Sequence, residues 1–313
     1  MQNIEFESPG YIFRKQFDDE IIKSNKAINE NPADAVSLSN LAHAYIILWC
    51  YGFLPHSEAI GNATDAALKA LEIDKKSGLA HVALGLIKES LWEWVDVENE
   101  FKLGIELSPN NELAYNWYAN YLYAMSRFDE AYVMANTAVN LSTDPGFKIG
   151  LGAISYFTQD FVRLKKEMLN LIAYYPNYAP AYDWLGMAYI QLQEFDNSIK
   201  AYEKAISLSG GLAEILGGLG HAYGMAGNEK EAKRVLNKMN DYSQKIYISP
   251  VQIAFVYAGL RDVDNTLRLL ERTYSEKSWE LIFMRTEPWF QHLHSDSRFK
   301  SIIERIKFPA NSV

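Results

Sequence analysis

The sequence is short of cysteine and of basic residues, and each shortage excludes a class of protein. Cys50 is the single cysteine among 313 residues, so no disulfide can form within the chain, and we expect a reducing compartment, the cytoplasm. Lys and Arg total 30 against 39 Asp and Glu, which gives a net charge of -9. A nucleic-acid-binding face needs a surplus of basic side chains to displace counterions from phosphate, so we expect no nucleic-acid partner.

Long apolar runs are also missing. The longest stretch without a charged residue, 35–54, carries Ser, Asn and His in a helical pattern, so we expect it in a protein core and not in a membrane. The opening residues MQNIEFESPG show no secretion signal. Few Pro and Gly (10 and 18), with 20 Tyr and 7 Trp, favour an all-α protein, and the length allows one extended or two compact domains.

The chain does contain an internal repeat. A mostly small residue in the second helix of each candidate unit recurs every 33 or 34 positions: Ala63, Val97, Ala131, Leu164, Ser198, Ala232 and Thr266. Twelve positions earlier, the first helix repeats a small residue: Gly85, Ala119, Gly152, Gly186, Gly220 and Ala254. Two helices that pack about 8–10 Å apart leave no room for a large side chain where they cross. One pair cannot cover its own apolar faces, so successive pairs are predicted to stack into a solenoid.

These residues resemble a known family. The unit AYDWLGMAYIQLQEFDNSIKAYEKAISLSG, residues 181–210, is similar to a tetratricopeptide repeat, with Leu185-Gly186 in the first helix and Tyr202 in the second. Units 78–111 and 112–145 are similar, and Pro109 and Pro176 are expected to follow helix ends. The resemblance covers about residues 17–278. It implies an all-α α-solenoid, a right-handed superhelix of helix-turn-helix units, that binds a protein or peptide.

The repeat predicts a single solenoid over residues 1–313. It consists of a partial unit at 17–32, about seven units over 35–278 with an insertion at 46–62, and a C-terminal cap at 279–313. The insertion is inferred because Ala63 follows Tyr45 by 18 residues, whereas Ser198 follows Tyr189 by 9. An amphipathic helix at 298–307 is expected to form the cap. Because helix 17–31 lacks a full partner, we expect self-association or docking at the N-terminal end.

A narrower resemblance concerns residues 92–131 and 287–306. Both segments are similar to the tetratricopeptide arms of bacterial winged-helix regulators, nucleotide cyclases and kinases, in which the arm senses or docks and a separate domain acts. The expected alternatives are therefore a free-standing scaffold and the arm of something longer.

No catalytic, cofactor or metal site is predicted. Cys50 has His43 and His56 nearby in sequence, but a buried structural thiol beside Trp49 is the preferred interpretation. His292 and His294 lack further ligands at metal-binding spacing and are expected at the surface. The glycine-rich stretches at 150–152 and 217–224 lack phosphate-loop spacing and are interpreted as helix-crossing positions.

The remaining function is recognition. In the resembled family the first helices line a concave groove, which implies groove-binding positions at His43, Asn116, Asn120, Tyr123, Tyr156, Asp183, Met187, His221 and Phe255. Amides four residues apart, Asn116 and Asn120, are expected to hold an extended peptide backbone. No Lys or Arg occupies a groove position, so we expect apolar or basic segments to bind and acidic chaperone tails not to bind. Two functions stay open: a non-enzymatic scaffold, and a sensory arm that binds a small ligand or peptide and signals to a separate effector.

Overall fold

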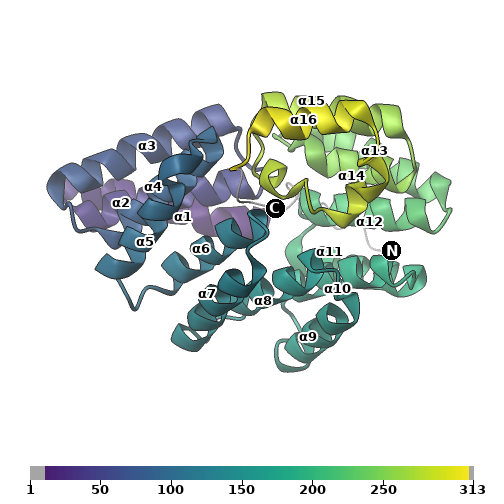
Figure 1. Ribbon diagram of the computed structural model, residues 1–313, viewed down its shortest axis with the longest axis horizontal. Helices are drawn as coiled ribbons and strands as arrows, with labels where there is room; N and C mark the ends of the chain where they lie inside the picture. Colours follow the sequence, from purple (N-terminus) through teal and green to yellow (C-terminus); the bar gives the residue numbers. More distant parts are fainter. Residues whose placement is uncertain (1–10, 310–313) are drawn as a thin grey trace.

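The computed structural model describes residues 11–309, and every regular element in them is helical, which confirms the all-α prediction. The elements are α1 Tyr11–Glu30, α2 Ala35–Cys50, α3 His56–Ile73, α4 Gly78–Leu91, α5 Trp94–Leu107, α6 Glu112–Ala124, α7 Phe128–Leu141, α8 Gly146–Phe157, α9 Phe161–Tyr174, α10 Ala179–Gln191, α11 Phe195–Ser209, α12 Ala213–Met225, α13 Glu229–Ser243, α14 Pro250–Gly259, α15 Val263–Ser275, η1 Trp279–Phe283, η2 Pro288–Leu293 and α16 Ser297–Ile306. Within the described range, none of the helices is long and apolar enough to span a bilayer. The helices form a solenoid of antiparallel pairs (Figure 1).

The predicted crossing positions are where helices meet. All seven second-helix positions, from Ala63 to Thr266, are fully buried or nearly so. A Cβ on Gly186 would lie 2.7 Å from the ring of Tyr202, and one on Gly85 would lie 3.1 Å from Phe101. Ser198 Oγ donates a 2.9 Å hydrogen bond to the Gly186 carbonyl, which links the two positions twelve residues apart. The small residues are therefore close-approach positions, as predicted.

A second periodic feature lies in the turns between paired helices. One residue in each turn has a left-handed backbone, with φ between 58° and 75°: Trp92, Ser126, Gln159, Gln193, Gly227 and Arg261. The next residue donates its N–H to a carbonyl five positions back, as Glu194 does to Tyr189 at 2.8 Å. This bond closes the end of the first helix. Only Gly227 among these residues is a glycine, so the sequence did not reveal this feature.

The insertion at 46–62 is mostly helical and not a long loop. Relative to the α10–α11 pair, α2 ends three residues later, the connection is two residues longer, and α3 begins four residues earlier, which accounts for all nine extra residues. Gly52, with φ of 66°, has the left-handed conformation that Gln193 has in the regular turn. The insertion therefore adds about one turn to each helix.

The N-terminal helix also differs from expectation. Helix α1 begins at Tyr11, six residues before the predicted helix at 17–31, and runs without a break to Glu30. Asp18 and Asp19 therefore lie inside α1, whereas Asp129 and Glu130 lie in the first turn of α7. Helix α1 packs against α2.

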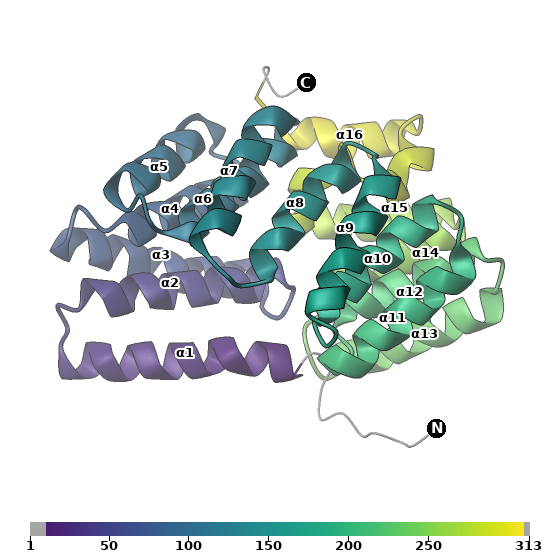
Figure 2. The same cartoon turned by 90° about the horizontal axis from the view of Figure 1, so that it is seen from below.

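The two ends of the solenoid meet. Trp49 Nε1 in α2 donates to the Lys277 carbonyl at 3.1 Å, and Trp94 Nε1 in α5 donates to the Ile306 carbonyl at 3.1 Å. Figures 1 and 2 show α1–α5 on one side and α10–α15 on the other, with α6–α9 joining them. Helix α16 packs along α15, with Arg298 paired to Asp264 and Arg305 paired to Glu271. Its apolar face is buried at Phe299, Ile302 and Ile306, as its amphipathic pattern predicted.

Candidate functional site

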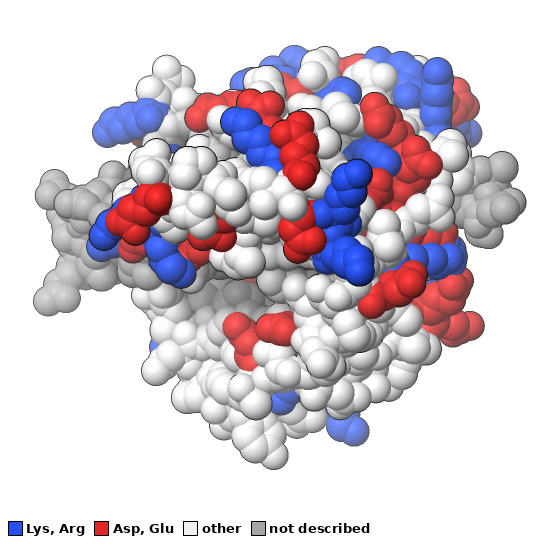
Figure 3. Space-filling view, turned by 90° about the vertical axis from the view of Figure 1, so that its left-hand side faces the viewer, with Lys and Arg blue, Asp and Glu red and all other residues white. Residues whose placement is uncertain are grey.

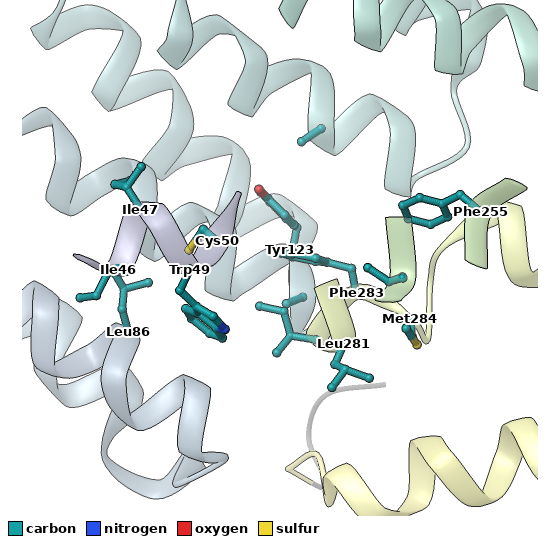
Figure 4. Packing of buried hydrophobic residues seen from close by; sticks show 14 of the residues in the cluster. Ile46, Ile47, Trp49, Cys50, Leu86, Tyr123, Phe255, Leu281, Phe283 and Met284 are labelled. Carbon is teal, nitrogen blue, oxygen red and sulfur yellow. The ribbon is translucent and has the colours of Figure 1, made fainter. Parts of the chain in front are cut away.

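Between α15 and α16 the chain leaves the solenoid and crosses its inner face. We call residues 277–293, which include η1 and η2, the strap. In η1, the ring of Trp279 lies 6.2 Å from Trp117 of α6, and that of Phe283 lies 5.6 Å from Tyr123 of α6 and 5.4 Å from Phe157 of α8. These rings meet at the distances of favourable aromatic pairs. Figure 4 shows Leu281, Phe283 and Met284 between Trp49 and Tyr123 on one side and Phe255 on the other.

The second half of the strap contacts the C-terminal units. Trp289 stacks on His221 of α12 with ring centroids 4.4 Å apart, and its ring meets the edge of Phe255 of α14 at 4.7 Å. Phe290 stacks on Phe255 at 5.4 Å. Contacts to the first helices of five units are possible only because these helices converge on one inner face. Several of the residues predicted to line a groove lie on that face, and the chain itself occupies part of it.

Polar contacts fix the direction of the strap. Tyr156 of α8 donates its hydroxyl hydrogen to Glu287 Oε1, and the backbone N–H of Trp289 donates to the same oxygen at 3.1 Å. Arg285 donates to the carbonyl of Ala124, at the end of α6, at 3.1 Å. Burial raises the pKa of Glu287 to about 7, and the two hydrogen bonds partly oppose that rise.

The strap covers four of the nine predicted groove residues. Tyr123, Tyr156, His221 and Phe255 are 5%, 0%, 2% and 9% exposed, and each contacts the strap. The sequence predicted these four residues on the inner face, where they were expected to be free to bind a partner. The predicted C-terminal cap at 279–313 included most of the strap. Nothing local in the sequence shows in which direction a chain turns after its last repeat.

The other predicted groove residues have mixed environments. His43 accepts a hydrogen bond from Trp117 Nε1 at 3.0 Å, and burial lowers its pKa to about 4, so the imidazole is neutral. The side-chain amide of Asn120 donates to the carbonyl of Asn116 in the same helix at 3.0 Å, so it is already used. Asn116 and Met187 are half-buried. Of the two side-chain amides expected to bind a peptide, only that of Asn116 is not already used in this way.

A group of carboxyl side chains lies on the inner face without basic partners. Asp183 of α10 is 6% exposed, Glu280 of η1 is half-buried, and Glu214 of α12 is exposed. Within the described residues, none of the three forms an ion pair with Lys or Arg. Figure 3 shows a hollow in the surface with acidic side chains at its lower edge.

The carboxyl groups affect one another. Burial, and then the charge of Glu214, raise the pKa of Asp183 well above its usual range. Burial raises the pKa of Glu214 to about 7. For Glu280, burial and the charge of Glu214 raise the pKa to about 8. Desolvation and like charge both disfavour the ionised form, so this part of the inner face would be stabilised by a cation.

Cys50 has the environment of a structural thiol, as predicted. It is 5% exposed in the core, and burial, with the charges of Glu89 and Glu280, raises its pKa well above its usual range. His56 contacts Ser90 Oγ at 3.2 Å, but Ser90 is buried and donates to the Ile87 carbonyl at 2.7 Å. The hydroxyl of Ser90 therefore makes a hydrogen bond within its own helix and is not accessible to a substrate.

The described histidine, cysteine and carboxylate side chains do not gather into a metal site. Across residues 11–309, no group of three or more His, Cys, Asp or Glu side chains is arranged to hold a metal ion. His294 is exposed as expected, whereas His292 is half-buried.

The repeat pattern did not reveal the strap anchors Trp279, Phe283, Glu287 and Trp289. A signal was present, since WELIFMRTEPWF holds four aromatic residues in a stretch without helical spacing. Apolar residues without a helical or strand period can mark a segment that is buried by extended packing against other elements.

Comparisons with known proteins agree with this architecture. The tetratricopeptide repeat family model matches residues 179–211. The human tetratricopeptide repeat protein 6 is 27% identical over 151 residues, 48% of this chain, and the match spans 29% of that protein's length.

Solved structures share the fold at low identity. Cut9–Hcn1 of the APC/C is 13% identical with a TM-score of 0.63, covering 94% of this chain and 53% of that one. Yeast Tom70 is 17% identical with a TM-score of 0.54, covering 95% and 63%. The chain is thus a repeat protein with a tetratricopeptide repeat at 179–211 and the solenoid fold of such structures.

Proposed function

We propose that the protein is a non-enzymatic adaptor that binds an apolar or basic segment of a partner protein on the inner face of its solenoid. The observation that carries the proposal is the strap. The inner face already holds an aromatic-rich segment by ring contacts and by hydrogen bonds from side chains. Helical solenoids commonly use such a concave surface for recognition.

Charge supports the choice of partner. Asp183, Glu214 and Glu280 lack basic partners among the described residues, so a Lys or Arg side chain would gain charge-assisted hydrogen bonds there. An acidic tail would add like charge. The absence of Lys and Arg from the predicted groove positions agrees with this preference.

The proposal is tested with purified protein on an array of basic-aromatic, apolar and acidic peptides. We expect retention of the first two classes and no retention of the acidic class. Asp183→Asn should weaken retention of basic peptides, whereas Asp65→Asn on the exposed face of α3 serves as the matched control. Equal retention of acidic peptides, or no effect of Asp183→Asn, would refute the proposal.

Three finer features are proposals of the same kind. A cytoplasmic location is consistent with the single buried thiol, Cys50. A role as the sensory arm of a regulator is the second candidate, and it is favoured by the titratable carboxyl groups inside the solenoid. Self-association through the N-terminal end is supported by Ile22 of α1, which is 67% exposed.

A further inference from the structure

The strap matches the inner face in shape. Most of its apolar side chains are buried, with Leu281, Met284 and Phe290 each 1% exposed or less, whereas Trp279 is half-buried. Trp279 meets the ring of Trp117 edge to face, Phe283 stacks on Phe157, and Trp289 stacks on His221, and all three partner rings belong to first helices. The inner face therefore accommodates aromatic residues spaced by four and then by six positions, as in Trp279, Phe283 and Trp289.

The strap does not match the inner face in charge. It adds the half-buried carboxyl group of Glu280 to an inner face that already carries the buried Asp183, and burial and the charge of Glu214 raise the pKa of both groups. Like charges repel unless protons or cations neutralise them. The buried hydroxyl of Tyr202, 0% exposed and affected by the charges of Asp183 and Glu214, has no hydrogen-bond partner in the structure. This region is thus incompletely satisfied with the strap in place.

The strap is also built so that it can leave. Its backbone hydrogen bonds are local, such as Leu281 N to the Ser278 carbonyl and Phe290 N to the Glu287 carbonyl. In the described residues, no backbone–backbone bond joins it to a first helix. The strap is held to the first helices by side-chain contacts alone. Its release would therefore break none of the backbone hydrogen bonds within those helices.

We infer that the strap occupies, within the same chain, the site of the partner segment, and that the partner carries the strap's aromatic spacing with a basic residue in place of Glu280. This inference rests on the proposed function. A Lys at that position would retain the ring contacts and place an ammonium beside Glu214 and Asp183. The partner would then displace the strap by exchanging a repulsive contact for an attractive one.

The test uses the full chain and fluorescent peptides of residues 277–294, in the native sequence and with Glu280→Lys, measured by anisotropy. We expect the Lys peptide to bind about tenfold more tightly, the ratio given by one charge-assisted hydrogen bond. Glu214→Gln in the protein should remove most of this difference. Glu72→Gln, on exposed α3 surface, is the matched control and should leave it unchanged.

Variants of the strap in the chain test competition. Glu280→Lys should hold the strap in place and weaken both peptides at least about tenfold, whereas Phe283→Ala should loosen it and strengthen both. Circular dichroism confirms folding. If Phe283→Ala does not fold, hydrogen exchange on the unmodified protein replaces it, and the strap amides should exchange before those of α12 and α14.

Several results would overturn the inference. If the native peptide binds as tightly as the Lys peptide, the occupant is the strap of a second copy. If neither peptide binds the unmodified chain or Phe283→Ala, or if strap amides exchange only with global unfolding, the strap is a fixed part of the core. If basic peptides on the array bind equally with Glu280→Lys in the chain, the proposed function stands and the shared site is wrong.

Discussion

The clearest prediction concerns two glycines that should respond in opposite directions to the same substitution. Gly186 of α10 faces the fully buried ring of Tyr202, and an added Cβ would lie 2.7, 2.8 and 2.9 Å from three ring atoms. On its other edge the ring meets Gly218 of α12 still more closely, so it cannot move aside. Gly61 is an exposed residue inside α3 with no atom within 4 Å of an added Cβ.

The magnitudes follow from two opposing effects. Alanine gains about 1 kcal/mol over glycine in a helix interior, and Gly61→Ala should stabilise the protein by about that amount. Overpacking costs about 1–3 kcal/mol, and the clamped ring of Tyr202 places Gly186→Ala near the upper end. We therefore expect Gly186→Ala to destabilise by about 1–2 kcal/mol net.

Urea unfolding followed by far-ultraviolet circular dichroism measures both changes. A double variant, Gly186→Ala with Tyr202→Leu, should recover part of the loss, because the smaller side chain makes room for the methyl group. Stabilisation by Gly186→Ala, or the same sign for Gly186→Ala and Gly61→Ala, would refute the assignment of Gly186 as a close-approach position.

Three other predictions concern pH, the thiol and the turns. Burial raises the pKa of Glu89 and Glu280 to about 8, above unfolded values near 4.5, so the folded chain binds more protons between these limits. Below about pH 6.5 the neutral imidazole of buried His43 opposes this trend, because the unfolded chain binds its proton more tightly. Stability should therefore fall as pH rises from about 7 to about 8, by on the order of 1–2 kcal/mol; a flat or rising unfolding midpoint across this range contradicts it. Cys50 should react with a thiol reagent only on unfolding, and rapid modification of the native protein would argue against its burial. Gln159→Gly should stabilise by about 0.5–1 kcal/mol by relieving a left-handed backbone, whereas Lys200→Gly inside α11 should cost about 1 kcal/mol; thermal melts that rank them in the reverse order would contradict this.

Local sequence determined the helices and their pairing. Small residues at Gly186 and Ser198, with Tyr202 on the same helix face, specify where two helices can cross, and this information repeats every 33 or 34 residues. The nine extra residues between Tyr45 and Ala63 could be counted from the sequence as well. Their helical conformation could not be predicted from the sequence, because Gly52 and Pro55 are residues that disfavour a helix interior. Packing favours the two longer helices, α2 and α3.

The tertiary structure alone decided what happens on the inner face. Each repeat specifies its own crossing, but the curvature that brings Trp49 to Lys277 and Trp94 to Ile306 is the sum of many small rotations between neighbouring units. That closure sets the space which Phe283 and Trp289 fill. It also gathers Asp183, Glu214 and Glu280 from distant parts of the chain, where desolvation and mutual repulsion, both long-range effects of the fold, give them their altered protonation.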